Sequence, residues 1–382
     1  MVYLDHNATS PLRPEARAAM EGAFSVVGNP SSVHLEGRVA RRLIEDARES
    51  VAALVGARPQ DVIFTSGGTE ANMLALQGAF AGATVAEAPI TRLFVSSIEH
   101  DSVLHTAMGI GEREPAVRVS AIPVTSDGVI DFAALGVLLK EDRGRALIVA
   151  MAANNETGVV QPIHSIATLA AEYGALLHVD AVQACGKIAV DAACADYLAI
   201  SAHKIGGPAG AGALIVREGA PLAAQMLGGG QERGRRAGTE NLIGVVGLGA
   251  AAEAIQGEDI SPILALRDRY ESLLRTLHPN AVFFGSEVSR LVNTSNFALP
   301  DLVAETAVIS LDMDGVMVSA GSACSSGKLR ASHVLTAMGV PEELAGSALR
   351  VSFGWNSLPT DVDKVLASLE KISARTRSRQ AA

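Results

Sequence analysis

The chain has 382 residues, of which 48% are hydrophobic and 19% charged, so it can form about two or three domains with large cores. Lys and Arg number 31 against 41 Asp and Glu, and this net charge of −10 argues against binding nucleic acid through its phosphates. No stretch approaches about 18 uncharged apolar residues, and the first residues lack the pattern of a secretory signal. The three cysteines have no C-x-x-C spacing, which excludes a disulfide scaffold and a cysteine-only zinc site. We therefore expect a soluble, cytoplasmic enzyme that binds neither membranes nor nucleic acid.

Short apolar runs alternate with segments of helical spacing along most of the chain. Val39–Leu54 and Ile163–Tyr173 have the spacing of amphipathic helices. Strands that are almost entirely apolar and alternate with helices are typical of a mainly parallel sheet covered on both faces. The sequence therefore predicts an α/β fold, with strands at Asp61–Phe64, Leu93–Ser97, Ala146–Met151, Leu176–Asp180, Tyr197–Ser201 and Gly212–Val216.

A glycine-rich turn follows the first of these strands. The segment Thr65-Ser-Gly-Gly-Thr-Glu70 precedes Ala71–Phe80, which has helical spacing. A strand, a glycine turn and a helix direct free backbone N–H groups and the positive end of the helix dipole at an anion. Gly67 and Gly68 would let a phosphate approach the backbone, and the Thr69 hydroxyl would donate a further hydrogen bond. The alternative is an ordinary turn with a helix N-cap and no ligand.

Asp180 and Lys204 each end or closely follow a predicted strand, which places both at the sheet edge where α/β proteins bind ligands. One interpretation is a structural Asp–Lys pair. A sharper one is pyridoxal phosphate, because a lysine in a cleft forms an imine with an aldehyde and an acid keeps a pyridine nitrogen protonated. Thr69 would then hold the phosphate. His100, just after another strand, would stack on the ring and carry protons.

Two segments are candidate functional loops. Gly228–Glu240 combines arginines with glycines, which suits either an anion-facing loop or a solvated charged one. Ser319–Gly327 contains only small residues around Cys324, so we expect a mobile loop that carries an exposed nucleophile. Cys185 and Cys194 have apolar neighbours, and we expect them to be inert core residues.

A competing dinucleotide pattern is present. Gly247–Ala252 fits G-x-G-x-x-A and follows the apolar run Ile243–Val246, which would suit a nicotinamide dehydrogenase. Because this segment lies beyond the main run of strands, we interpret it as a helix whose small residues allow close packing.

Taken together, the motifs resemble the cysteine desulfurases among the class V, fold-type I pyridoxal-phosphate enzymes. The resemblance covers nearly the whole chain, with the motifs in order. Ala153–Gly158 and Gln231–Asn241 are most similar to the nitrogen-fixation type. The segments that carry the resemblance are Tyr3–Thr9, Gly28–His34, Thr65–Glu70, Ser97–His100, Ala153–Gly158, His178–Gln183, Ser201–Lys204, Gly228–Glu240, Ser319–Gly327 and Leu349–Phe353.

The resemblance implies a large pyridoxal-phosphate-binding α/β domain at 12–256, with a mainly parallel seven-stranded sheet between helices. A smaller α+β domain would comprise 1–11 and 257–382 and carry the cysteine loop at 319–330. The sequence departs from the family pattern at Ala209, where lysine is common, and at Lys328–Arg330, where the charge is reversed. The second departure leaves the identity of the partner open.

The resemblance also implies residue roles. Lys204 would bind the cofactor covalently, Asp180 would pair with the ring nitrogen, Gln183 would bond the phenolic oxygen, and His100 would stack on the ring. The phosphate would be held by Gly68, Thr69, Ser201 and His203, and by Thr239 from the other subunit of a homodimer.

Asn155 and Arg350 would bind the amino-acid end of L-cysteine, with Arg350 gripping the carboxylate. Lys204 would remove the Cα proton, and Cys324 would accept the sulfur as a persulfide while L-alanine leaves. An iron–sulfur scaffold, with a link to nitrogenase, is the implied recipient, and Cys324 would then touch a nascent cluster. A selenocysteine lyase or an aminotransferase is the alternative within the same fold.

Overall fold

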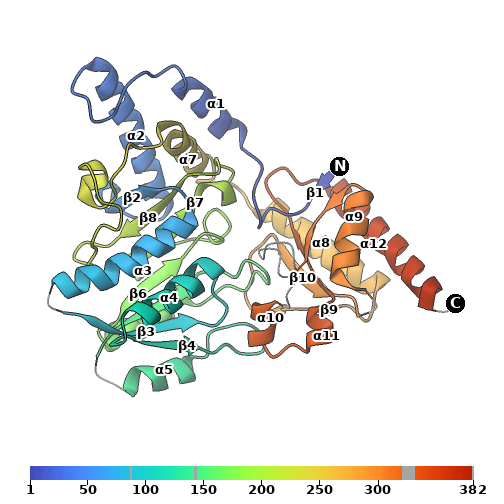
Figure 1. Cartoon of the computed structure of the whole chain (residues 1–382). Helices are drawn as coiled ribbons and strands as arrows, with labels where there is room; N and C mark the ends of the chain where they lie inside the picture. Colours follow the sequence, from blue (N-terminus) through green and yellow to red (C-terminus); the bar gives the residue numbers. More distant parts are fainter. Residues whose placement is uncertain (87, 142–143, 301, 321–331, 381–382) are drawn as a thin grey trace.

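The computed structural model describes residues 1–86, 88–141, 144–300, 302–320 and 332–380, with side chains described up to residue 376. A larger part surrounds a seven-stranded sheet, and a smaller part holds most of the C-terminal third of the chain (Figure 1). Among the described helices, none is long and apolar enough to cross a membrane.

The large sheet has the strand order β2-β8-β7-β6-β5-β3-β4. Only β8 runs against its neighbours; the other six strands point the same way. All six predicted strands are confirmed, with small shifts at their ends. The sequence missed β4, an edge strand whose half-exposed residues do not form a continuous apolar run. The strands are β2 (Val62–Thr65), β3 (Ile90–Ser96), β4 (Arg118–Ile122), β5 (Arg145–Met151), β6 (Leu176–Asp180), β7 (Tyr197–Ser201) and β8 (Gly212–Val216).

Helices cover both faces of this sheet, as nearly continuous apolar strands require. Along β5, Leu147 and Val149 pack against α3 and α4, while Ile148 belongs to the cluster that contains α2, α5, α6 and α7. The helices of this part are α1 (Pro14–Ala23), α2 (Leu35–Leu54), α3 (Gly68–Val85), α4 (Asp101–Arg113), α5 (Phe132–Lys140), α6 (Ile163–Glu172) and α7 (Leu242–Ala254), with short 3₁₀ turns η1 (Pro59–Asp61), η2 (Ala192–Cys194), η3 (Ala202–Lys204) and η4 (Gln231–Gly234).

The segment with the dinucleotide pattern lies inside a helix. Ile243–Val246 and Gly247–Ala252 both belong to α7, so the strand that a dinucleotide site requires is absent there. A Cβ on Gly249 would lie 2.6 Å from the backbone Cα of Ala47, so glycine is needed where α7 crosses α2. The interpretation as a close-packing helix is confirmed, and the dehydrogenase alternative is wrong.

The smaller part is α+β. Its four-stranded antiparallel sheet has the order β12-β13-β10-β9, and the N-terminal β1 pairs in parallel with β11. The aromatic rings of Tyr270, Phe297 and Phe353 meet edge to face in its core. The elements are β1 (Val2–Tyr3), α8 (Ser261–Leu277), β9 (Val282–Phe283), β10 (Thr294–Ala298), α9 (Ala304–Met313), β11 (Val316–Met317), β12 (Ser319–Ala320), α10 (His333–Ala337), α11 (Glu342–Ala345), β13 (Ala348–Ser352) and α12 (Pro359–Gln380).

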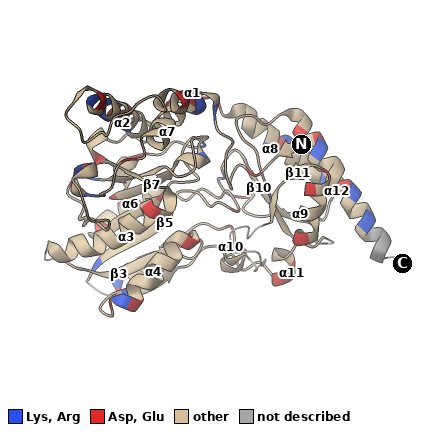
Figure 2. Ribbon diagram, turned by 45° about the horizontal axis from the view of Figure 1, so that its top comes forward, with Lys and Arg blue, Asp and Glu red and all other residues tan. Residues whose placement is uncertain are grey.

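The two parts pack against each other beside the carboxyl ends of β3 and β5. Ile98 and Met151 from the larger part share an apolar cluster with Phe284, Ala298 and Leu335 from the smaller one. Charged residues lie mainly on the peripheral helices and turns, and the middle of the large sheet is largely uncharged (Figure 2). Polar side chains at the carboxyl ends of the strands therefore lie next to a largely apolar sheet.

Candidate active site

A cavity of about 330 Å³ lies at the carboxyl ends of β5, β6 and β7, where the two parts meet. It brings together residues that the sequence singled out from segments far apart in the chain. Thr239 does not line it, and Cys324 lies outside the described residues. The cavity is also lined by Asn7, Ala8, Asn72, Ser102, Met151, Ala153 and Val182. The singled-out residues that line it are Gly68, Thr69, His100, Asn155, Asp180, Gln183, Ser201, His203, Lys204 and Arg350.

The glycine turn places the N-terminus of α3 at this cavity. The N-cap is Gly67, and among the described residues no side chain caps the helix there. A Cβ on Gly68 would lie 2.8 Å from Val182 Cγ2, which explains the glycine at this point. The buried Ser201 hydroxyl has no hydrogen-bond partner within the described part of the chain. Free backbone N–H groups and an unpartnered hydroxyl are the donors that a phosphate group needs.

Asp180 is held at the end of β6 by two hydrogen bonds. Asn72 Nδ2 donates to Asp180 Oδ2 at 2.7 Å, and the Val182 N–H donates to Oδ1 at 2.9 Å. The Oδ1 of Asn72 lies 2.9 Å from His178 Nε2. Burial lowers the pKa of His178 to about 3, so the neutral ring donates its Nε2–H to Asn72. This chain of hydrogen bonds fixes a carboxylate at the floor of the cavity.

Lys204 ends the 3₁₀ turn η3, directly after β7. Its Nζ donates to the carbonyl oxygens of Asn7 at 2.5 Å and Ala8 at 2.7 Å. Lys204 and Asp180 therefore hydrogen-bond to different groups, which replaces the Asp–Lys pair considered from the sequence. Burial, together with the nearby Lys204 and Lys187, lowers the pKa of His203 to about 4, so this ring is neutral at physiological pH.

His100 is the N-cap of α4 and borders the cavity. Its Nδ1 accepts a hydrogen bond from the Ser102 N–H at 3.1 Å, which orients the ring. The preceding residue, Glu99, is fully buried and accepts a hydrogen bond from the Met151 N–H at 2.6 Å. Burial and the nearby Asp180 raise the pKa of Glu99 well above its ordinary value. Both effects favour the protonated form of the Glu99 carboxyl.

Arg350 on β13 brings a guanidinium to the opposite wall. Its Nη1 donates to the carbonyl oxygen of Asn155 at 2.9 Å, and its Nη2 pairs with Asp5 Oδ1 at 2.7 Å. The Arg350 Nε is buried and has no partner within the described residues. The neighbouring Asn154 stabilises the turn that contains Asn155, because its Oδ1 accepts the N–H groups of Glu156 and Thr157, each at 2.9 Å.

Sequence reasoning did not assign roles to Asn7 and Asn72, although both line the cavity. The Asn7 carbonyl accepts from Lys204 and Gln183, and its Nδ2 donates to the Asn155 carbonyl at 3.2 Å. Asn72 bridges Asp180 and His178. The sequence signal for Asn72 was an amide within the alanine-rich segment of α3. Such a segment packs inside the protein, where an amide requires hydrogen-bond partners.

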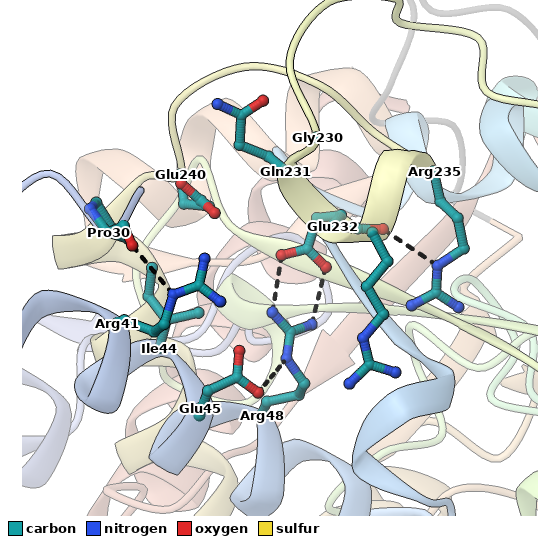
Figure 3. A pocket seen from close by; sticks show the side chains of 11 residues that line it. Pro30, Arg41, Ile44, Glu45, Arg48, Gly230, Gln231, Glu232, Arg235 and Glu240 are labelled. Atoms are coloured by element: carbon teal, nitrogen blue, oxygen red, sulfur yellow. Dashed lines mark hydrogen bonds and ion pairs between the residues drawn. The ribbon is translucent and has the colours of Figure 1, made fainter. Parts of the chain in front are cut away.

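Two arginines of Gly228–Glu240, Arg235 and Arg236, have partners within the protein, whereas Arg233 is exposed to solvent. Glu232 and Arg48 point toward one another, with Glu45 on the far side of the guanidinium (Figure 3). Arg236 pairs with Glu70 at 2.7 Å, and Arg235 donates to the carbonyl oxygens of Gln60 and Val62.

The cysteines differ from one another. Cys185 is buried, and burial raises the pKa of its thiol to about 12, which confirms it as an inert core residue. Cys194 is only half-buried, with Sγ 3.6 Å from His164 Nδ1, so its assignment to the core is wrong. The loop 321–331, with Cys324 and Lys328–Arg330, lies outside the described residues. Within the described part of the chain, no cluster of three or more His, Cys, Asp or Glu side chains could hold a metal ion.

Comparisons with known proteins agree on one family. Residues 2–365 match the family described as Aminotransferase class-V. A cysteine desulfurase of Cereibacter sphaeroides is 42% identical over 99% of this chain and 97% of its own length. An IscS-like cysteine desulfurase of Mycobacterium tuberculosis is 39% identical over 99% of this chain and 97% of its own.

Solved structures give the same result. The structure of a NifS-like protein from Rickettsia africae superposes with a TM-score of 0.87 at 33% identity, covering 97% of this chain and 99% of that one. A structure described as SspA in complex with cysteine has a TM-score of 0.81 at 30% identity, covering 94% of this chain and 100% of that one.

Proposed function

Because the chain belongs to the class V aminotransferase family and is a cysteine desulfurase that uses pyridoxal phosphate, we propose that the 330 Å³ cavity holds this cofactor and L-cysteine. The predicted fold-type I architecture is confirmed by NifS-like structures at 33% and 34% identity. The residues present suit the cofactor, because an unpartnered buried hydroxyl, a helix N-terminus, a fixed carboxylate and a lysine border one cavity.

The proposed binding roles follow from this arrangement. Asp180 pairs with the ring nitrogen, which its hydrogen bonds from Asn72 and Val182 favour because they hold the carboxylate in place. Gln183 meets the phenolic oxygen and His100 stacks on the ring. The phosphate is held by Gly68, Thr69, Ser201 and His203.

When bound, pyridoxal phosphate supplies an aldehyde for Lys204 and for the substrate amine, and a protonated ring that stores an electron pair. Arg350 and Asn155 orient L-cysteine by its carboxylate end. Lys204 Nζ takes the Cα proton. The Cys324 thiolate attacks the substrate sulfur, the carbon–sulfur bond breaks with its electron pair going to carbon, and protonation of that carbon leads to L-alanine. A persulfide remains on Cys324.

A single observation carries this proposal: residues from segments throughout the chain, from Gly68 to Arg350, converge on one cavity. The absorption spectrum of the purified protein before and after L-cysteine tests it. We expect a visible band that borohydride bleaches and that Lys204→Ala abolishes. Mass spectrometry of the reduced, digested protein should then find the added pyridoxyl mass on the Lys204 peptide, and its absence there would refute the assignment.

Replacement of Cys324 tests the sulfur-accepting role separately. Cys324→Ala should keep the cofactor band while sulfide release from L-cysteine collapses. Cys185→Ala is the matched control, because that thiol is buried and has a raised pKa. Sulfide release that persists in Cys324→Ala would favour the selenocysteine lyase or aminotransferase alternative.

We further propose that the enzyme is a homodimer in which Thr239 reaches the phosphate of the other subunit. In its own subunit Thr239 lines a separate cavity with Thr65 and Asn241. Exposed apolar side chains occur in the segments 24–39 and 226–227, where a dimer interface would cover them. They are Phe24, Val27, Val33, Leu35, Val39, Met226 and Leu227.

Mixed dimers test this arrangement. A Lys204→Ala chain combined with a Thr239→Ala chain should form a hybrid in which one site has both intact residues, so refolded mixtures should regain activity that neither variant has alone. Sedimentation should give twice the chain mass. A monomer, or a mixture without regained activity, would contradict the proposal.

We also propose that the recipient of the sulfur is an iron–sulfur scaffold, with Cys324 close to the nascent cluster, and that the enzyme works in the cytoplasm. The nitrogen-fixation-like segments support a role in nitrogenase assembly. Two domains, 12–256 and 1–11 with 257–382, are proposed from separate cores. One core joins Leu4 to residues between Leu266 and Ile372, and two others lie mainly within 12–256.

A further inference from the structure

Lys187 stands directly behind the cofactor cavity. The turn that follows β6 carries Gln183 and Lys187 four residues apart, close enough for their side chains to meet. Lys187 Nζ donates to Gln183 Oε1 at 2.8 Å and to Asn7 Oδ1 at 3.3 Å. Gln183 lines the cofactor cavity, whereas Lys187 lines a second, smaller cavity that it shares with Lys204.

These contacts determine the orientation of the Gln183 amide. Its Nε2 donates to the Asn7 carbonyl at 2.8 Å, and its Oε1 accepts from Lys187. Turning the amide by half a revolution would set its N–H groups against an amine and its oxygen against a carbonyl oxygen. Both hydrogen bonds would then be lost inside a buried network, so only one orientation is favourable.

The Asn7 amide is fixed in the same way. Its Nδ2 donates to the Asn155 carbonyl and to Thr294 Oγ1 at 2.9 Å, and its Oδ1 also accepts from Asn293 Nδ2 at 3.0 Å. Lys187 therefore faces two amide oxygens. Burial and the nearby Lys204 and Arg350 lower the pKa of Lys187 to about 7, but the amine has two hydrogens to donate even when neutral.

We propose that Lys187 is a positioning residue that keeps the second N–H of Gln183 directed at the cofactor, so that the site recognises a hydrogen-bond acceptor on the ring. In pyridoxal phosphate that acceptor is the phenolic oxygen. The inference rests on the proposed contact of Gln183 with this oxygen. Lys187 itself makes no contact with the cofactor and acts only through the amide.

The test compares two aldehydes that differ in one atom. Enzyme freed of cofactor is titrated with pyridoxal phosphate and with its 3-deoxy analogue, which lacks the phenolic oxygen, and both dissociation constants are measured by absorbance. In Lys187→Met we expect about five- to tenfold weaker binding of pyridoxal phosphate, as for one lost hydrogen bond. Binding of the analogue should change less than about twofold. A merely structural lysine would weaken both ligands equally, and that result would overturn the proposal.

Three further variants complete the design. Gln183→Leu should also lose the preference for pyridoxal phosphate over its 3-deoxy analogue. If this variant keeps the preference, Gln183 does not contact the phenolic oxygen. If Gln183→Leu loses this preference and Lys187→Met keeps it, Gln183 contacts the phenolic oxygen but Lys187 does not position its amide. Lys364→Met, on the exposed face of α12, is the matched control. If Lys187→Met does not fold, Lys187→Leu replaces it, because leucine also offers no donor to Gln183 Oε1; full discrimination in that variant would overturn the proposal.

Discussion

Arg350 and Asp5 form an ion pair although they lie 345 residues apart, with Arg350 Nη2 2.7 Å from Asp5 Oδ1. The guanidinium is almost fully buried, and Asp5 also accepts a hydrogen bond from Ser319 Oγ at 2.9 Å. The pair joins the N-terminal segment to β13 at the wall of the cavity. A substrate carboxylate that binds Arg350 therefore meets a guanidinium that already has one carboxylate partner.

Asp5→Asn should lower the stability of the protein by about 2 kcal/mol, because a buried guanidinium loses its counter-charge. The product L-alanine also carries a carboxylate, so it should raise the melting temperature more in this variant than in the wild type. Thermal unfolding with and without L-alanine measures both effects. Asp314→Asn, at the peripheral pair with Lys371, is the control and should change neither. Equal L-alanine shifts in the variant and the wild type would contradict a carboxylate role for Arg350.

Asn72→Ala should weaken cofactor binding about tenfold, because Asp180 Oδ2 and His178 Nε2 both lose their partner. The variant leaves the two charge-bearing roles, at Asp180 and Lys204, in place. Titration of cofactor-free protein with pyridoxal phosphate measures the change. Asn280→Ala, an exposed asparagine after α8, should bind the cofactor like the wild type. Unchanged affinity in Asn72→Ala would show that Asp180 needs no such support.

Glu156 makes stability depend on pH. Burial raises the pKa of this carboxyl from 4.5 to about 7, although Ser332 Oγ donates to it at 2.5 Å. A raised pKa in the folded state means that the contribution is favourable at low pH and is lost as pH rises from 4.5 through about 7. Glu156 therefore costs the wild type about 2 kcal/mol between pH 5 and pH 8.

Glu156→Gln should remove that part of the pH dependence, because the amide does not ionise. Urea unfolding of both proteins at pH 5 and pH 8 measures it, and groups such as Glu99 cancel in the comparison. The variant should gain stability relative to the wild type at pH 8. If both proteins show the same change between the two pH values, Glu156 is ionised throughout and its pKa is not raised.

Glu232→Ala should destabilise the protein by about 3–5 kcal/mol, because the buried Arg48 then keeps only the half-exposed Glu45 as a counter-charge. Glu232 bonds both terminal nitrogens of Arg48, at 2.8 and 2.9 Å, and also accepts the Phe64 N–H. Urea unfolding measures the loss. Glu218→Ala removes an exposed partner of Arg58 and should cost much less stability, because solvent screens that pair. Similar losses in the two variants would mean that the buried Arg48–Glu232 pair contributes no more to stability than an exposed pair.

Local patterns in the sequence predicted the strands, the turn before α3 and the residues at the strand ends. These features depend on periodicity and on residue type, which are visible along the chain. The edge strand β4 was missed because its residues are only half-buried and lack a continuous apolar run. The partners of the polar residues depend on packing. Asp180 binds Asn72 rather than Lys204, and the loop arginines pair with Glu70 and with backbone carbonyls.

The amino-acid sequence by itself determined which chemical groups this enzyme carries and the order of the α/β elements that present them. The tertiary structure decided which group meets which, as when Asp5 meets Arg350 or Lys187 orients Gln183. The physical reason is that a hydrogen bond requires its donor and acceptor to lie about 3 Å apart, whatever their separation along the chain. Only packing of the two parts brings such atoms to that distance.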